Sequence, residues 1–122
     1  MAGNDTYARG RLSWEEDSAV YAVVRETRYD PDRLTHAGSE LDDFQRLHAA
    51  QPGFEGNVVV DTSDGRRITL TLWASEAHST AARLALEPAV RRLLTPLMAA
   101  PSRIIGVGPV VTADVTRTGK DN

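Results

Sequence analysis

The sequence predicts one α+β domain in which four strands alternate with two helices. Three observations support this prediction. β-branched and aromatic residues gather in four short runs, two further segments carry apolar residues at three-to-four spacing, and Asp64-Gly65 separates the two central β-rich runs. At 122 residues the chain can bury a core without a disulfide or a structural metal. We expect the domain over residues 18–116, between a polar tail at 1–17 and a short tail at 117–122.

The first strand is expected at residues 19–29, where the run AVYAVVRETRY becomes alternating toward its end. Asp30 is then expected to cap a helix that has Pro31 at its first position. The apolar stripe of this helix is Leu34, Ala37, Leu41, Phe44 and Leu47. The segment Gln51-Pro52-Gly53-Phe54 should end it, because proline disfavours helix in the preceding residue.

Two strands, at residues 57–61 and 67–73, are expected to form a hairpin around Asp64-Gly65. In the second of them Thr69, Thr71 and Trp73 share one face of the sheet. Ser75 is a predicted cap for the second helix, whose inner face is expected to carry Ala77, Ala81 and Leu84 or Ala85.

Proline is unfavourable inside a helix, so we expect a break near Glu87 and a fresh turn from Pro88. That turn should direct Val90, Leu93, Leu94 and Leu97 inward. A last strand at residues 102–115, irregular at its glycines, completes the order βαββαβ. This order is typical of a ferredoxin-like domain, in which a four-stranded antiparallel sheet has both helices on one face. The other face is bare and apolar, so we expect a homodimer that pairs through it into an α+β barrel.

Composition excludes several classes of partner and chemistry. The chain has no cysteine, which excludes disulfides and thiolate chemistry. A net charge of −3 with interspersed signs does not favour nucleic-acid binding. There is no export signal and no long apolar run, so we expect a cytoplasmic protein without a membrane partner. Trp14, in the N-terminal tail, is expected either to dock loosely on the domain or to reach a neighbouring subunit.

Three stretches of the chain resemble the antibiotic biosynthesis monooxygenase-like family of dimeric α+β barrels. The resemblance covers about residues 19–115 and depends on Gln51-Pro52-Gly53-Phe54-Glu55-Gly56, the Asp64-Gly65 hairpin and Leu72-Trp73-Ala74-Ser75-Glu76. It implies the same fold. The family includes cofactor-free oxygenases, haem-degrading enzymes and members without known activity, so fold alone does not assign a reaction.

The resemblance also implies where a site would lie. Oxygenases of the family place a tryptophan at the end of the third strand, here Trp73, with an Asn four residues before it and a Tyr six after it. Thr69 and Ser79 occupy those two positions. Haem-degrading members use a Trp and an iron-ligating His in the second helix, where this chain has Ala82 and Arg92, so no haem is expected. Trp73 is therefore open to two interpretations, a core residue or a pocket wall.

Among polar residues, His48 and Arg25 are the further candidates for chemistry. All three histidines, His36, His48 and His78, are expected at the surface or rim rather than as catalysts. Of the three, His48 is the one most able to face a pocket, because it follows the stripe of Leu41 and Phe44. Arg25 could hold an acidic or enolate-like ligand, or form a salt bridge across the dimer. No phosphate cradle or metal-ligating pair of histidines is present, so we expect neither a cofactor nor a metal.

The leading functional hypothesis is a cofactor-independent monooxygenase with an apolar pocket between helices and sheet. The residues expected to line that pocket are Tyr21, Phe44, Thr69, Trp73 and Leu94. The first alternative is a non-catalytic barrel that binds a small hydrophobic or weakly acidic ligand, or that serves as a dimerising module. The second is an isomerase or cyclase, because one His or Arg in an apolar pocket suffices for enolisation.

Overall fold

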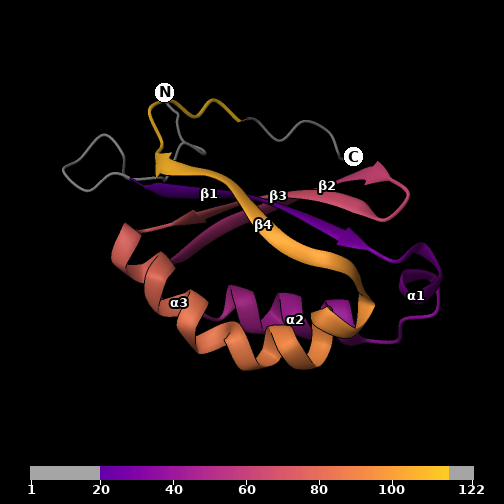
Figure 1. Cartoon of the computed structure of the whole chain (residues 1–122). Coiled ribbons are helices and arrows are strands. Elements are labelled where there is room, and N and C mark those ends of the chain that lie inside the picture. Colours follow the sequence, from indigo (N-terminus) through magenta and orange to yellow (C-terminus); the bar gives the residue numbers. More distant parts are fainter. Residues whose placement is uncertain (1–19, 116–122) are drawn as a thin grey trace.

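A computed structural model describes residues 20–115 and has one antiparallel sheet with helices on one of its faces (Figure 1). The strands are β1 (Tyr21–Tyr29), β2 (Phe54–Ser63), β3 (Arg66–Trp73) and β4 (Met98–Pro109), in the order β2-β3-β1-β4. The helices are α1 (Pro31–Thr35), α2 (Glu40–Ala49) and α3 (Glu76–Ala89). The predicted ferredoxin-like α+β class is confirmed. The expected tails, with Trp14, lie outside the described residues.

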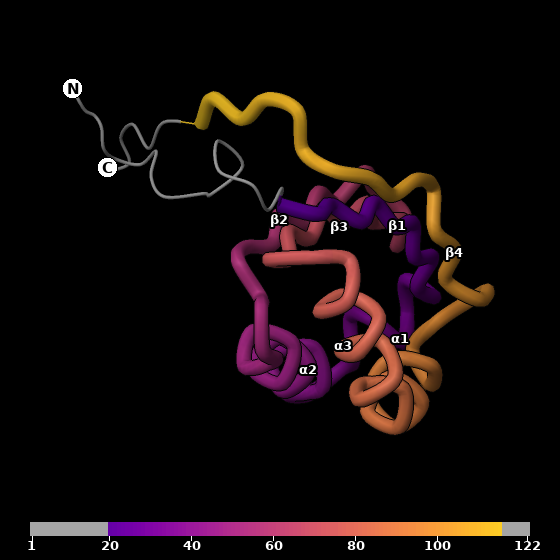
Figure 2. The backbone as a smooth tube through the Cα atoms, turned by 90° about the vertical axis from the view of Figure 1, so that its left-hand side faces the viewer, coloured from indigo at the N-terminus to yellow at the C-terminus, as the bar shows by residue number. Residues whose placement is uncertain are grey.

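Figure 2 shows α2 and α3 side by side against the same face of the sheet, with no described helix on the other face. The two faces carry different side chains because successive residues of a strand point in opposite directions. Val23 and Trp73 pack with Ala82 and Leu86 of α3 on the covered face, and a second cluster joins Ala89, Leu93 and Leu94. No helix of the described part is long and apolar enough to cross a membrane.

The first helical segment differs from the single helix that the sequence predicts. Asp30 does cap α1, accepting a hydrogen bond from the Arg33 amide at 3.1 Å. The chain then leaves helical conformation around Gly38, and α2 begins at Glu40. Glycine is a poor helix former, so the break falls where conformational entropy favours it. After the break, Leu41 and Phe44 still pack inward, whereas Leu47 is exposed rather than part of an inner stripe.

The second predicted helix corresponds to α3 and differs from the prediction in two respects. The expected break near Glu87 is wrong, because α3 runs through Pro88 and continues as a wider π-helical turn, Val90–Leu94, before a 3₁₀ turn, Thr95–Leu97. Such irregular turns commonly accommodate a missing helical hydrogen bond. The inner face is also different. It carries Ala82, Leu86 and Ala89, whereas the expected Ala77, Ala81, Leu84 and Ala85 are all exposed. Leu93, Leu94 and Leu97 are buried as predicted.

The open face of the sheet carries a charged cluster around Glu26. Its side chain is only 4% exposed, and its carboxylate lies 2.5 Å from Arg66 Nε, 2.7 Å from Arg103 Nε and 3.4 Å from Arg28 Nη2. Hydrogen bonds from Arg103 and Arg66 lower the pKa of Glu26 to about 2, against the opposing effect of burial. The carboxylate therefore stays ionised and joins residues of β1, β3 and β4.

The β2–β3 hairpin provides a test of the fold. Gly65 has φ +83°, and its carbonyl oxygen accepts a hydrogen bond from the Tyr29 amide at 2.7 Å. A Cβ at Gly65 would lie 2.1 Å from the Tyr29 carbonyl oxygen. We expect Gly65→Ala to lower the free energy of unfolding by more than the ~1–2 kcal/mol of the left-handed conformation alone, as measured by urea denaturation.

Gly38→Ala is the matched control for this experiment. A Cβ there meets only the flexible Glu40 side chain, at 3.4 Å. Its effect should stay within about 0.5 kcal/mol, as for ordinary surface substitutions. Equal losses in the two variants would contradict the assigned role of Gly65.

Candidate functional site

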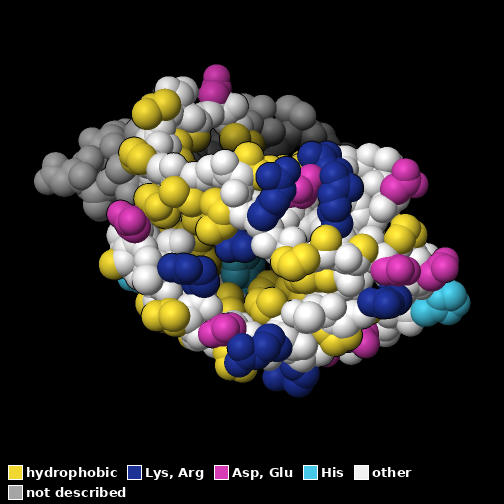
Figure 3. Space-filling view, in the orientation of Figure 1, with side chains coloured by type: hydrophobic (Ala, Val, Ile, Leu, Met, Phe, Trp, Pro, Cys, Tyr) yellow, Lys and Arg dark blue, Asp and Glu magenta, His cyan; other side chains and the backbone are white. Residues whose placement is uncertain are grey.

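A cavity of about 500 Å³ lies between the covered face of the sheet and the helices. Figure 3 shows it as a hollow surrounded by hydrophobic and basic side chains, with a histidine at its base. The residues that sequence analysis assigns to a pocket all line it: Tyr21, Phe44, Thr69, Trp73 and Leu94. Arg25 and His48 line it as well. Trp73 is both a pocket wall and a core residue, with 4% of its surface exposed.

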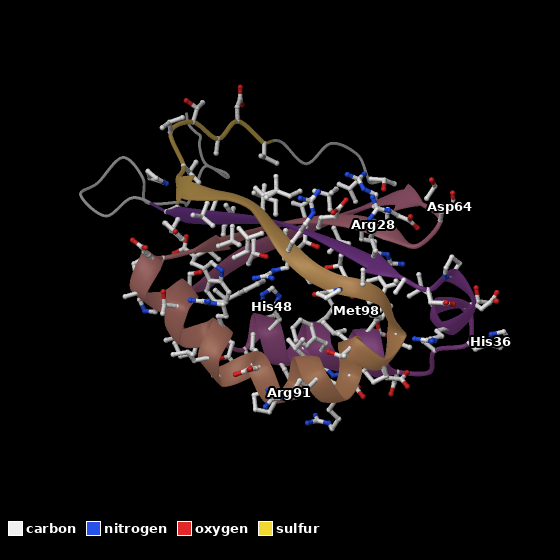
Figure 4. The ribbon with its side chains drawn as sticks, viewed as in Figure 1. Arg28, His36, His48, Asp64, Arg91 and Met98 are labelled. Atoms are coloured by element: carbon white, nitrogen blue, oxygen red, sulfur yellow. The ribbon has the colours of Figure 1, made fainter. Side chains whose placement is uncertain are left out.

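His48 reaches the cavity from α2 and is surrounded by aromatic rings (Figure 4). Its ring centre lies 5.5 Å from that of Phe44, 5.5 Å from that of Trp73 and 5.3 Å from that of Phe54. Burial lowers the pKa of His48, and the positive charge of Arg25 lowers it further. The imidazole is therefore neutral near pH 7, and a neutral imidazole can accept a proton.

The other two histidines have local structural contacts. His36 is exposed at the end of α1, and its Nδ1 lies 2.8 Å from the Asp32 carbonyl oxygen (Figure 4). His78 Nδ1 lies 2.8 Å from Ser75 Oγ, the cap of α3. The His78 ring also packs on Gly53, where a Cβ would lie 2.3 Å from a ring carbon. This contact, together with the φ of +82° at Gly53, explains why the turn before β2 requires glycine. Sequence analysis missed the His78 contact.

Arg25 lies on the helix-covered face of β1. Its Nη1 donates a hydrogen bond to Ser102 Oγ at 3.3 Å, and Thr27 shares that hydroxyl at 3.2 Å. Burial lowers the pKa of Arg25, and so does the positive charge of Arg83. This placement does not favour the alternative role of Arg25 in a salt bridge across the dimer, because its side chain lies on the face opposite to the one through which the dimer is expected.

Sequence analysis missed several polar residues that line the cavity. Arg67 shares the face of Thr69 and Trp73, so strand alternation could have identified it. Arg83 could have been assigned to the cavity only if the inner face of α3 had been predicted correctly. Asn57, on β2, lies opposite Thr71, whose hydroxyl donates to Asn57 Oδ1 at 2.7 Å.

Thr69 and Ser79, at the two polar positions of the oxygenase pattern, both line the cavity. Within residues 20–115 there is no group of three His, Cys, Asp or Glu side chains arranged to hold a metal ion.

Comparison with known proteins finds similar structures. No protein-family profile and no curated protein sequence matches the chain. A Nitrosomonas europaea protein of unknown function superposes with a TM-score of 0.66 and 15% identity, over 83% of this chain and 98% of that one. A second protein from that organism, provisionally named an antibiotic biosynthesis monooxygenase, gives 0.65 and 12%, over 79% and 94%. SnoaB, a cofactor-independent oxygenase from Streptomyces nogalater, gives 0.53 and 20%, over 84% and 100%.

At these identities the comparisons establish the fold. The chain has the fold of antibiotic biosynthesis monooxygenase-like proteins, as the sequence resemblance implies. Identity of fold does not carry the residues of a reaction with it.

The lowered pKa of His48 predicts how stability depends on pH. The unfolded chain, with an ordinary imidazole near 6.5, takes up a proton at higher pH than the folded chain does. Folding free energy should therefore become less favourable as the pH falls through about 6.5. We expect His48→Gln to lose less stability than the wild type between about pH 7.5 and about pH 5.5 in urea denaturation.

His36→Gln is the control. The His36 side chain is exposed, and the substitution also removes one histidine from the chain. It should keep the pH dependence of the wild type. An unchanged slope in His48→Gln would contradict the buried, neutral state of His48.

Proposed function

We propose that this protein is a cofactor-independent monooxygenase-like enzyme that oxidises a small aromatic or polyketide-type substrate in the cavity. The observation that carries the proposal is the environment of His48. A neutral imidazole lies among three aromatic rings and close enough to Arg25 for that cation to lower its pKa. SnoaB, a cofactor-independent oxygenase, has the same fold, which adds support.

The chemistry needs a base and a site for negative charge. His48 would accept a proton from the activated CH₂ group of a phenolic substrate, which leaves a conjugated anion. Arg25 would stabilise the negative charge on the oxygen of that anion. The anion gives one electron to O₂, and the two radicals join in a new C–O bond. The O–O bond then breaks, one oxygen remains as a carbonyl, and the other leaves as water with both hydrogens of the CH₂ group. The substrate supplies all the electrons, so the balance closes without a cofactor.

The aromatic residues would position the substrate. Phe44 and Trp73 provide flat apolar surfaces on opposite elements, α2 and β3. Offset or edge-on contacts between aromatic rings contribute about 0.5–1.5 kcal/mol beyond area burial. A planar substrate is therefore the class that this cavity favours.

A non-catalytic ligand-binding barrel is the second candidate. Thr69 and Ser79 replace the Asn and Tyr of the oxygenase pattern, and this replacement favours binding without turnover. The same cavity and the same aromatic walls would serve it.

Oxygen uptake discriminates between the two candidates. With a panel of anthrones and phenols, we expect the wild type to consume O₂ in an electrode assay and His48→Gln to lose about 10²–10⁴-fold in kcat/KM, the usual contribution of a positioned base. Trp73→Phe should raise KM. His36→Gln, the matched histidine control, should retain full activity. No oxygen uptake and no product with any panel member would support the binding barrel instead.

A homodimer through the open sheet face is the proposed assembly. Val58, Val60 and Ile105 are 53%, 49% and 50% exposed, although they belong to central parts of their strands. Val58 and Val60 lie opposite Leu70 and Ile68, on the side away from the cavity. Exposed apolar side chains on an uncovered sheet favour pairing with a second copy of the face.

Light scattering coupled to size-exclusion chromatography tests this assembly. We expect a dimer for the wild type and a shift toward monomer for Val60→Arg, because an arginine would be desolvated in the interface. Leu84→Arg is the control, since Leu84 is 66% exposed on α3. A monomeric wild type, or a dimer unaffected by Val60→Arg, would contradict the proposed interface.

A further inference from the structure

The cavity contains more cations than its own acids neutralise. Arg25, Arg67 and Arg83 all line it. Within residues 20–115, none of these three guanidinium groups has a carboxylate within 4.0 Å, whereas five other arginines do. The acids that line the cavity are Glu76 and Glu87, and Glu87 is already paired with Arg91 at 2.9 Å. The described side chains thus leave positive charge available to a ligand.

Two of these arginines are neighbours on the sheet. Arg25 lies opposite Thr69, and Arg67 lies opposite Thr27, in the register of β1 with β3. They occupy adjacent rows of the covered face, a diagonal relation in which Cα atoms are about 7–8 Å apart and long side chains can meet. One ligand group can therefore contact both.

Arg67 has an unused donor. Its Nε is buried and has no hydrogen-bond partner among the described residues. Its guanidinium carbon lies 5.8 Å from the centre of the Tyr29 ring, a position that fixes the group without satisfying its N–H donors. The unpaired Nε is costly, and no described carboxylate within 4.0 Å compensates the charge of this guanidinium, so an anionic ligand group in the cavity would stabilise it.

Trp73 and the two strand arginines, Arg25 and Arg67, lie at different positions along the cavity floor. Trp73 pairs with Tyr21 at one end of the β1–β3 register, Arg25 lies in the middle, and Arg67 lies toward the other end. The His48 ring packs against Trp73, at the first of these positions. A bound molecule that fits both ends has an apolar ring system at one end and an anionic group at the other.

We propose that the cavity selects aromatic ligands that carry a carboxylate, with the rings beside Trp73 and His48 and the carboxylate held by Arg25 and Arg67. This inference rests on the proposed function in that it names the substrate class of the same cavity. Guanidinium groups are suited to binding this carboxylate because they can donate two parallel hydrogen bonds to it. The electrostatic repulsion between Arg83 and Arg25, which lowers the pKa of Arg25, would also be relieved by a bound anion.

A matched pair of probes tests the proposal in the full chain. Anthraquinone-2-carboxylate and anthraquinone-2-carboxamide share their rings and differ in charge. By isothermal titration calorimetry at low salt, we expect the carboxylate to bind at least about tenfold more tightly than the amide, as charge-assisted hydrogen bonds predict. Arg25→Gln and Arg67→Gln should each remove most of that preference and change amide affinity by less than about twofold.

Two further variants make the outcomes interpretable. Arg46→Gln is the control, because Arg46 is 72% exposed on α2 and pairs with Asp43 away from the cavity. It should keep the full preference. Arg67→Lys keeps the charge and should retain part of the preference, so it tests the proposal even where Arg67→Gln does not fold.

Equal binding of the two probes, no binding of the carboxylate, or a preference that persists in both glutamine variants would overturn the proposal. Binding is measured without turnover, so the two hypotheses can fail separately. An intact carboxylate preference without oxygen uptake would overturn the oxygenase function alone. Oxygen uptake without any carboxylate preference would overturn this inference alone.

Discussion

The central position of β1 determines which side chains reach the cavity and which reach the open face. β1 pairs with β3 on one side and with β4 on the other, and its alternation sends the consecutive residues Arg25 and Glu26 to opposite faces. Arg25 enters a cavity without a carboxylate within 4.0 Å of it among the described residues, while Glu26 joins three arginines on the open face. A slip of one residue would exchange the two charges and leave each in an unfavourable environment. The register and the electrostatics of the site therefore depend on each other.

On the open face of the sheet, Glu26 compensates the positive charge of three arginines. Arg28 and Arg66 lie directly opposite each other on β1 and β3, where like charges repel, and the Glu26 carboxylate contacts both. Arg103 adds a contact from β4. The buried Glu26 carboxylate thus balances cations of three strands. On the covered face no described carboxylate lies within 4.0 Å of Arg25 or Arg67. The two faces of the sheet therefore differ in how their arginine charges are compensated.

Local signals in the sequence predicted most of the fold, and long-range packing explains what they missed. Strand alternation placed Thr69, Thr71 and Trp73 on one face, and the caps at Asp30 and Ser75 are where hydrogen-bonding chemistry puts them. The phase of α3 was not predictable because alanines occur on several of its faces, so apolar spacing does not select one. Asn57 enters the cavity through its pairing with Thr71, which requires the β2–β3 register. The volume of the cavity depends on how far the helices stand from the sheet, which no local pattern encodes.

The arrangement of polar groups also bears on how this fold supports chemistry. Thr69 and Ser79 lack the amide and the phenol found in the oxygenase pattern, yet Asn57 brings an amide to the same cavity from the neighbouring strand. Its oxygen accepts from Thr71, and its nitrogen donates to Gln45 Oε1 at 3.3 Å, so the amide is held in place from both sides. The imidazole of His48 on α2, the guanidinium of Arg25 on β1 and the amide of Asn57 on β2 all line one cavity. Three separate elements thus supply polar groups to the cavity, and a comparison limited to the positions of Thr69 and Ser79 underestimates what the cavity contains.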